Sequence, residues 1–411
     1  MCAKWNNEID HTVVIKAIAA VAKVNKEGKA AFHALDIDRY TATLASGMDF
    51  HKDIPQYTRQ AIVWRAVCDS VTQGKLNADN IIRIAEEKGR EHLRKKKADF
   101  VLLTSFSAKL PSDRLVIRLG EDQLLLNRRY PRRFDRSKYL SIIAHTIPSE
   151  QPREYAWVRV PVVGRSWREA GDAALDGVNL LRGIWNLGLT FQRWRVSSDS
   201  RGPMNDIVLG PIHTVHHPDG KPAADSFYYE PEYRKPHKLC DLSERYDKLR
   251  QFQQSVMRQV NRSRAGPLLQ RSLIRYARTQ DEADLDDCFL NLWALLEALT
   301  CTAKASYDTT VHRAASVWLD PAYCVQELKH LRNWRNRSVH LSEPSDTRET
   351  HAYQLKRYVD KMFEFLIFNR DSRRQSLEDT MQLLNLPHDD AELKRKLSLY
   401  RKALRLHAAK P

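Results

Sequence analysis

The C-terminal part of this sequence changes character at Leu242, where mixed segments give way to long stretches with helical periodicity. Apolar residues recur there every three or four positions, and short polar connections separate the stretches. We therefore predict helices over residues 243–260, 268–277, 284–304, 310–318, 323–340 and 345–368, with further helix between 376 and 409. Long helices joined by short turns favour a helical bundle.

The first 240 residues follow a different pattern. Helical spacing dominates residues 1–98, and β-branched runs separated by polar turns begin at Asp99. We predict strands at 100–106, 114–119, 123–127 and 155–163, then a helix at 166–189. Residues 197–237 are loop-rich with two short strand-like pieces, at 206–209 and 226–229, and we interpret them as the end of the α+β domain and a linker. The predicted fold class is an α+β N-terminal region (1–240, helical over 1–98 and strand-rich over 99–240), followed by an all-α bundle (241–370) and a basic helical extension (371–411).

The composition narrows the class of protein. No stretch approaches the roughly 18 apolar residues that a membrane-spanning helix needs, and the N-terminus lacks the apolar core of a signal peptide. The six cysteines form no C-x-x-C pair, and Cys288 and Cys301 lie within apolar helical spacing, so we expect buried free thiols. These features favour a cytoplasmic protein with no membrane partner.

The net charge points to a polyanionic partner. The chain carries 67 Lys and Arg against 51 Asp and Glu, a formal charge of +16 at pH 7. Basic runs at 90–97, 128–136 and 394–405 spread this charge along the chain. A basic surface attracts nucleic acid, although any single run is more often only a solvated face.

One predicted helix contains a carboxylate in an apolar setting. Residues 284–304 are apolar on nearly every side, which is typical of a buried helix. Glu297 stands in the middle of this stretch, and a buried carboxylate is costly unless it has a cationic partner. Arg335 lies on the apolar stripe of the helix at 323–340, so we predict that it pairs with Glu297.

The same helix ends in the candidate catalytic residues Arg335, Asn336 and His340. A permanent cation, an amide and a group that titrates near neutral pH suit chemistry on a phosphodiester. Asn336 and His340 are four residues apart and share a helix face. Arg332 and Arg337 flank these residues and are candidate RNA-binding side chains.

This constellation resembles the HEPN superfamily of helical-bundle ribonucleases, whose signature is Arg-x4–6-His, commonly Arg-Asn-x-x-x-His. Three segments look like the Apea-like HEPN subgroup: Ala-Leu-Leu-Glu-Ala-Leu-Thr at 294–300, Val-His-Arg-Ala-Ala at 311–315, and Leu-Arg-Asn-Trp-Arg-Asn-Arg-Ser-Val-His at 331–340. The likeness covers roughly residues 245–370. A second Arg-x5-His match, Arg401 to His407, lies in a polar tail without apolar flanks, and we interpret it as chance.

The resemblance implies metal-independent endoribonuclease activity without a cofactor. His340 would be the general base, Arg335 would stabilise the phosphorane-like transition state, and Asn336 would orient phosphate or imidazole. Glu297 would support the site by fixing Arg335. The family likeness also implies RNA as substrate, a homodimer with a composite active site, and a prokaryotic antiphage or abortive-infection role with a phage-derived trigger.

Two alternatives from other classes stay open. The protein could be a non-catalytic RNA-binding or dimerisation protein on the same scaffold, or a nucleic-acid-binding regulator. A histidine-rich segment with neighbouring ligands could also suggest a metal site, at residues His213, His216, His217, Asp219, His237 and Cys240. This segment lacks the paired spacing of a zinc site, so we predict no metal.

Overall fold

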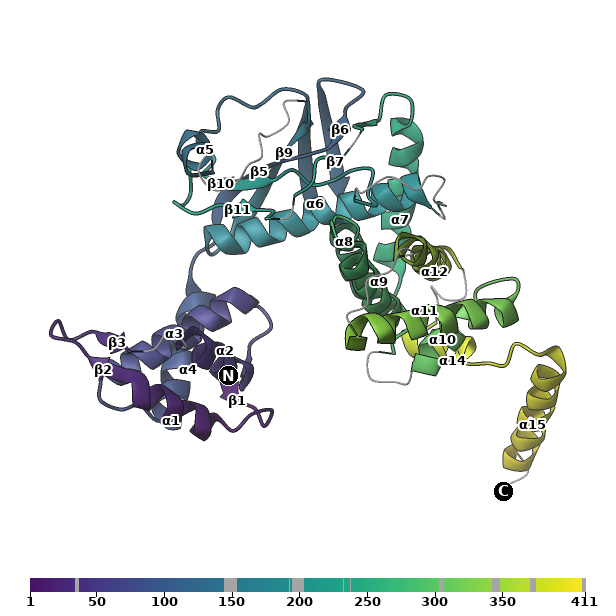
Figure 1. Ribbon diagram of the computed structural model, residues 1–411, viewed down its shortest axis with the longest axis horizontal. Coiled ribbons are helices and arrows are strands. Elements are labelled where there is room, and N and C mark those ends of the chain that lie inside the picture. Colours follow the sequence, from purple (N-terminus) through teal and green to yellow (C-terminus); the bar gives the residue numbers. More distant parts are fainter. Residues whose placement is uncertain are drawn as a thin grey trace. The chain divides into compact units, whose positions relative to one another are not determined.

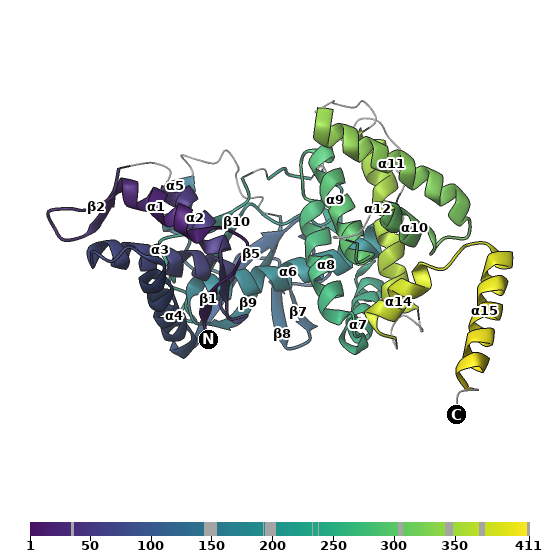
Figure 2. The same cartoon turned by 90° about the horizontal axis from the view of Figure 1, so that it is seen from below.

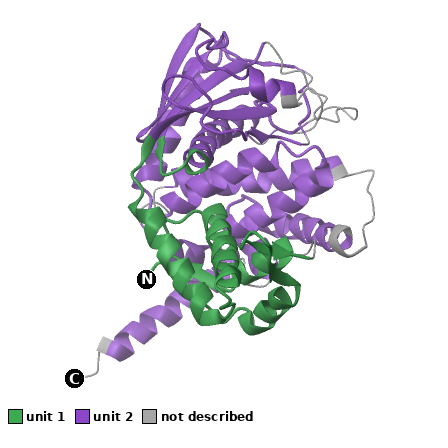
Figure 3. Cartoon of the chain, turned by 90° about the vertical axis from the view of Figure 1, so that its left-hand side faces the viewer, with its two compact units in different colours: residues 1–98, 163–169 green, residues 99–162, 170–411 purple. Residues whose placement is uncertain are grey.

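The computed structural model describes the chain except residues 34–36, 144–153, 192, 194–202, 232, 237, 303–306, 342–347, 370–374 and 409–411, and except the side chains of 142–143, 338–341, 348 and 408. The chain divides into two compact units (Figure 3). The first comprises residues 1–98 and 163–169, and the second comprises 99–162 and 170–411. The strand-rich segment and the C-terminal helices therefore belong to the same compact unit.

The first unit is mainly helical. It contains α1 (His11–Val21), α2 (Ile37–Ser46), α3 (Gln56–Thr72) and α4 (Ala78–Arg94), with the short antiparallel pairs β1 (Ala3–Trp5) with β4 (Met48–Phe50) and β2 (Ala22–Val24) with β3 (Ala30–Phe32). Asn77 caps α4, because its side chain accepts from the backbone N–H of Asn80 at 2.9 Å. Apolar side chains spaced three or four apart on α3 and α4 form the core, including Ile62, Val63, Ile81 and Ile84.

A six-stranded sheet forms one side of the second unit (Figure 1). Its order is β11 (Tyr228–Tyr229), β10 (Ile212–His216), β5 (Ala98–Phe106), β9 (Ala156–Gly164), β8 (Asp122–Asn127) and β7 (Arg114–Leu119). Strands β5, β7, β8 and β9 confirm the sequence-based prediction. Strand β11 falls within the strand-like piece predicted at 226–229. Strand β10 was not predicted, although it pairs with β5 and β11 and is buried along its whole length. Its three polar residues, His213, Thr214 and His216, hid this strand, since histidine and threonine next to proline and glycine are typical of a loop.

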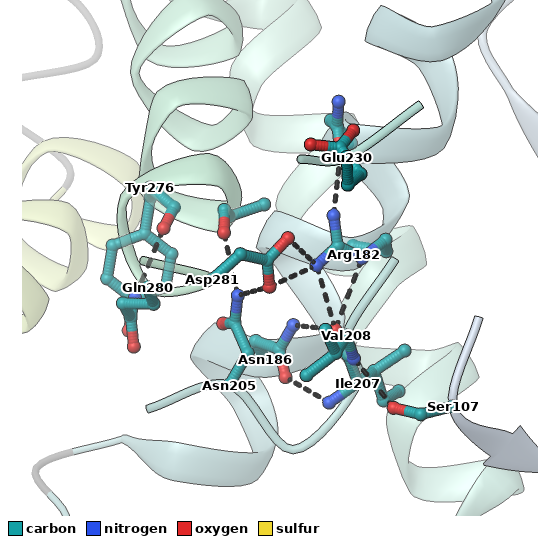
Figure 4. A network of polar contacts seen from close by, with 12 residues as sticks. Ser107, Arg182, Asn186, Asn205, Ile207, Val208, Glu230, Tyr276, Gln280 and Asp281 are labelled. Carbon is teal, nitrogen blue, oxygen red and sulfur yellow. Dashed lines mark hydrogen bonds and ion pairs between the residues drawn. The ribbon is translucent and has the colours of Figure 1, made fainter. Parts of the chain in front are cut away.

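The long helix α6 (Trp167–Thr190) packs beside this sheet, and Figure 4 shows the polar network that fixes its position. The fully buried guanidinium of Arg182 donates to the backbone carbonyl of Ile207 and forms an ion pair with Asp281. Asn205 donates to the same carboxylate at 2.6 Å, and Asn186 bonds the backbone of Ile207 in both directions. These contacts join α6 to residues 205–208 and to the end of α8.

Helices make up most of the rest of the second unit (Figures 1 and 2). They are α7 (Tyr246–Arg262), α8 (Gly266–Thr279), α9 (Leu285–Leu299), α10 (Tyr307–Ala315), α11 (Pro321–Leu341), α12 (Arg348–Phe368), α14 (Leu377–Leu384) and α15 (Asp390–Ala408). Each of these helices overlaps a range predicted from periodicity, but α9 ends before residue 304 and α10 begins before residue 310. Helix α9 packs along α12, and α8 and α11 also contact α9. The mixed architecture, with strands before helices, follows the predicted order. Two smaller elements complete the unit, α5 (Ser137–Ile143) and the parallel pair β6 (Ala108–Lys109) with β12 (Cys240–Asp241).

The two cysteines near α9 differ in their surroundings. Cys288 is fully buried, as predicted, whereas Cys301 is exposed. Helix α9 ends at Leu299, and Cys301 follows it with a φ of 54°, the left-handed conformation that commonly terminates a helix. The prediction of a buried thiol at Cys301 is therefore wrong. Within the described parts of the chain, no helix has the length and apolar character needed to cross a membrane.

Candidate active site

Helix α11 presents the motif residues to two neighbouring helices. Toward α10, Arg332 forms an ion pair with Asp308, and the Arg335 guanidinium lies over the ring of Tyr307. Toward α12, the exposed His330 and the buried Trp334 contact His351. The motif therefore lies where α10, α11 and α12 meet.

The Arg335 guanidinium is held by an aromatic ring. Its central carbon lies 4.9 Å from the centre of the Tyr307 ring, a cation–π distance. The Tyr307 ring lies edge-on to the Trp293 ring of α9, with 6.5 Å between their centres. Trp293 in turn donates from Nε1 to Glu297 Oε1 at 2.8 Å. Glu297 and Arg335 thus belong to one neighbourhood, linked through two aromatic side chains.

The predicted ion pair between Glu297 and Arg335 is absent. Glu297 is half-buried, and no ion pair among the described residues joins its carboxylate to a cation. The indole N–H of Trp293 takes the place of the cation that the sequence suggested. Glu297 is therefore bonded to Trp293, and the rings of Trp293 and Tyr307 lie between it and Arg335.

The other motif side chains are arranged around Arg335. Asn336 is half-buried and accepts a hydrogen bond from Arg335 Nη1 at 3.2 Å. Arg337 is exposed, and its guanidinium lies 5.8 Å from the centre of the Trp334 ring. Arg332 is partly buried and its charge is compensated by Asp308.

His340 belongs to the last turn of α11, but its side chain lies outside the described residues. The Arg401 and His407 match, by contrast, lies on α15 with both side chains exposed. No aromatic ring among the described residues covers Arg401, whereas Tyr307 covers Arg335. Arg335 thus lies among packed helices, as its apolar neighbours in the sequence indicate, whereas Arg401 lies on an exposed helix.

Sequence reasoning missed the residues that position Arg335. The helix predicted at 310–318 begins three residues earlier, at Tyr307, so Tyr307 and Asp308 were not recognised as helical. Asp308 lies in the first turn of α10, where a carboxylate is favoured by the helix dipole. The preference for a carboxylate in the first helical turn was the one sequence feature that could have placed the start of α10 at this point. Nothing in the local pattern pointed to Tyr307 as a platform for Arg335.

The histidine-rich segment is structural in the described part of the chain. His213 is fully buried and contacts Thr104 Oγ1 at 2.6 Å and Glu230 Oε1 at 3.1 Å. His216 contacts Thr214 and the carbonyl of Gly220. Among the residues that the structure describes, no group of three or more His, Cys, Asp or Glu side chains could hold a metal ion. His237 lies outside these residues.

The buried position of His216 predicts sensitivity to acid. Burial lowers the pKa of His216 to about 4, and the nearby Arg136 acts in the same direction. Because the folded pKa lies below that of the unfolded chain, the unfolded state binds the proton more readily between these two values. The stability contributed by neutral His216 is thus complete above the unfolded pKa, about 6.5, and is lost as pH falls toward 4.

We expect His216→Gln to reduce this loss. Urea unfolding of wild type and variant at about pH 7 and about pH 5 should give a smaller difference in unfolding free energy for the variant. His407→Gln changes an exposed histidine and serves as the control, with the pH dependence of the wild type. If His216→Gln kept the pH dependence of the wild type, the loss of stability in acid could not be attributed to His216.

Comparison with protein-family models, curated proteins and solved structures found no match to this chain. The likeness to HEPN ribonucleases therefore rests on the motif residues and their helical setting alone.

Proposed function

We propose that the C-terminal helices form a HEPN-like bundle that acts as a metal-independent endoribonuclease. The observation that carries this proposal is the setting of Arg335. Its guanidinium is stacked on Tyr307, bonded to Asn336, and free of a compensating ion pair among the described residues. An arginine held in place without a carboxylate partner keeps its charge for a phosphate.

In the proposed reaction, His340 takes the proton from a ribose 2′-hydroxyl, and the 2′-oxygen attacks the adjacent phosphorus. The bond from phosphorus to the 5′-oxygen breaks, and the departing oxygen takes a proton from solvent. Arg335 stabilises the charge that develops on the phosphoryl oxygens. The products are a 2′,3′-cyclic phosphate and a 5′-hydroxyl, and the need for a 2′-hydroxyl makes RNA the substrate.

The surrounding residues have supporting roles in this proposal. Asn336 orients the phosphate or the imidazole, and the exposed Arg337 binds the RNA backbone. Arg332 would contribute to RNA binding only when RNA competes with Asp308 for its guanidinium. Two protomers would pair through the motif face and share a composite site. The role that fits this chemistry is cytoplasmic prokaryotic antiphage defence, with a phage-derived trigger.

The test is RNA cleavage by purified full-length protein in EDTA, with the ends of the products mapped. We expect Arg335→Ala to lower the rate by about 10²–10³, the effect of removing one donor to a developing oxyanion. We expect His340→Ala to lower it by about 10²–10⁴, the contribution of a general base. His407→Ala changes the histidine of the second motif match and should cleave like wild type.

Each result has a defined meaning. Cleavage that survives EDTA, yields cyclic phosphate ends and disappears in both variants supports the proposal. Undiminished cleavage by His340→Ala would contradict it. RNA binding without cleavage, together with equal growth of cells that express wild type or variant, would favour a non-catalytic RNA-binding protein. A monomer at micromolar concentration would argue against the composite site.

A further inference from the structure

The first compact unit contains a small cavity between α3, α4 and the two residues before α6. The cavity has a volume of 190 Å³. Four cationic side chains, Arg65, Lys88, Lys95 and Arg165, line it, together with the single carboxylate of Glu91. The excess of positive charge makes this cavity attractive to an anion.

Part of this charge is not compensated by neighbours. Lys88 lies 3.6 Å from Glu91, and Arg165 forms an ion pair with Glu169 at 3.1 Å. Arg65 and Lys95 form no ion pair with another described residue. Two exposed cations of the cavity lining are thus available to a ligand.

Three residues that line the cavity each carry a polar side-chain atom that is buried without a hydrogen-bond partner in the described structure: Thr58 Oγ1, His92 Nε2 and Arg165 Nε. Thr58 is 7% exposed and His92 is 8% exposed. Buried polar atoms are nearly always bonded, so three unsatisfied ones at a single cavity call for a ligand. The Oε2 atom of Glu169 lies 3.7 Å from His92 Nε2, beyond hydrogen-bond length.

The chemistry of these atoms selects the kind of ligand. The hydroxyl of Thr58 and the N–H of Arg165 can both donate, and His92 can donate from Nε2 in one tautomer. An acceptor-rich anion could satisfy all three at once, whereas a cation or an apolar group could not. A tetrahedral oxyanion has acceptors in several directions, and arginine is the residue best suited to phosphate.

The position of the cavity strengthens this argument. Ser166 precedes α6, and its Oγ accepts from the backbone N–H of Glu169 at 3.1 Å, as a helix-capping residue does. The same Oγ lies 2.6 Å from the hydroxyl of Tyr57 in the cavity lining. The positive end of a helix dipole therefore adds to the cationic side chains.

We propose that this cavity is a binding site for a phosphate monoester. A volume of 190 Å³ is below the roughly 300 Å³ of a typical small-molecule site, so it encloses the phosphoryl group and part of what it is attached to. The rest of the ligand lies outside. A free mononucleotide and the 5′-phosphate of an RNA end share this chemistry. The proposal is independent of the proposed ribonuclease activity, because it concerns residues of the first unit.

The first test compares two threonine variants of the full-length protein by titration calorimetry with inorganic phosphate. Thr58→Val removes the unpartnered hydroxyl and keeps the shape of the side chain. We expect its affinity for phosphate to fall about tenfold or more, because a hydrogen bond to a charged group is lost. Without phosphate, its thermal stability should equal or exceed that of wild type, since an unsatisfied polar atom is removed.

Thr41→Val is the matched control. Thr41 is also a buried threonine of the first unit, but its hydroxyl is bonded to the carbonyl of Ile37 at 3.0 Å and does not line the cavity. This variant should bind phosphate as wild type does. Equal affinity in wild type and Thr58→Val would overturn the proposal, and so would the absence of saturable binding to wild type.

His92 offers a second readout that does not depend on stability. Burial lowers the pKa of His92, the neighbouring Arg165 and Lys95 lower it further, and Glu169 opposes them. A bound phosphate would favour the protonated ring, so the pKa measured by NMR should rise on saturation. The resonance of the His92 ring is assigned as the one that is missing from the spectrum of His92→Gln. A pKa that does not respond to phosphate would place the anion elsewhere and overturn the proposal.

The source of the phosphoryl group is then distinguished by comparing ligands. A nucleoside monophosphate that binds more tightly than phosphate, with no gain for an oligoribonucleotide, identifies a free small molecule. A 5′-phosphorylated oligoribonucleotide that binds more tightly than both, and more tightly than its 5′-hydroxyl form, identifies an RNA end. In either case, the affinity should fall in Thr58→Val and persist in Thr41→Val.

Discussion

Replacing Lys356 with methionine is expected to lower the free energy of unfolding by about 3–5 kcal/mol, because it leaves a buried carboxylate without its cation. Lys356 is 1% exposed on α12, and its ammonium donates to Asp360 at 2.6 Å and to the carbonyl of Thr190 at 2.8 Å. Asp360 is fully buried and also accepts from the hydroxyl of Tyr276. The three side chains join α12 to α8 and to the end of α6.

The measurement is urea or thermal unfolding of the full chain. Lys361→Met on the same helix is the matched control. Its ion pair with Glu364 is also 2.6 Å long, but the two side chains are 28% and 40% exposed. An exposed pair of this kind contributes less than about 1 kcal/mol. Adding Asp360→Asn to Lys356→Met should recover part of the loss, since it removes the unpaired charge. Equal effects of Lys356→Met and Lys361→Met would contradict the prediction.

Gly183→Ala is expected to destabilise the second unit by about 3 kcal/mol or more, because no space exists for a methyl group between α6 and α8. A Cβ at Gly183 would lie 2.1 Å from the backbone oxygen of Leu273 and 2.8 Å from its carbonyl carbon. Both atoms belong to the backbone of α8, so the two helices would have to separate. Separation would also disturb Arg182, the residue before Gly183 on α6, and its ion pair with Asp281.

Gly177→Ala provides a control with the opposite sign. Gly177 lies in the same helix, and a Cβ there would lie 3.8 Å from Asp122 Oδ2, an ordinary contact. Because alanine is favoured over glycine within a helix, this variant should be more stable by up to about 1 kcal/mol. Thermal unfolding of both variants beside wild type provides the test. A Gly183→Ala protein as stable as Gly177→Ala would show that the helices can move apart at little cost.

Periodicity predicted most of the elements in this protein. The C-terminal helices and the strands β5, β7, β8 and β9 follow from spacings of three to four and of two within short windows. Strand β10 escaped this reasoning because it is buried on both sides and carries His213, Thr214 and His216 where an apolar run is expected. Its polar groups are satisfied by residues far away in the sequence, such as Thr104 and Glu230.

The candidate site was predictable only in part. The placement of Arg335 and Asn336 on one helix turn follows from their spacing, and so does the apolar character of α9. The partner of Glu297 did not follow, since its charge suggested a cation and the structure provides the indole of Trp293. A carboxylate accepts from any nearby donor, so its partner depends on packing between helices.

The sequence by itself determined where most helices and strands form, because these properties depend on neighbours within one or two turns. It also determined that an arginine, an asparagine and a histidine share the end of α11. Only the tertiary structure decided that Arg335 lies over Tyr307, that Lys356 is buried against Asp360, and that Thr58 lines a cationic cavity. These outcomes depend on which surfaces pack together. Many arrangements satisfy the same periodicity, and the burial of each polar group distinguishes among them.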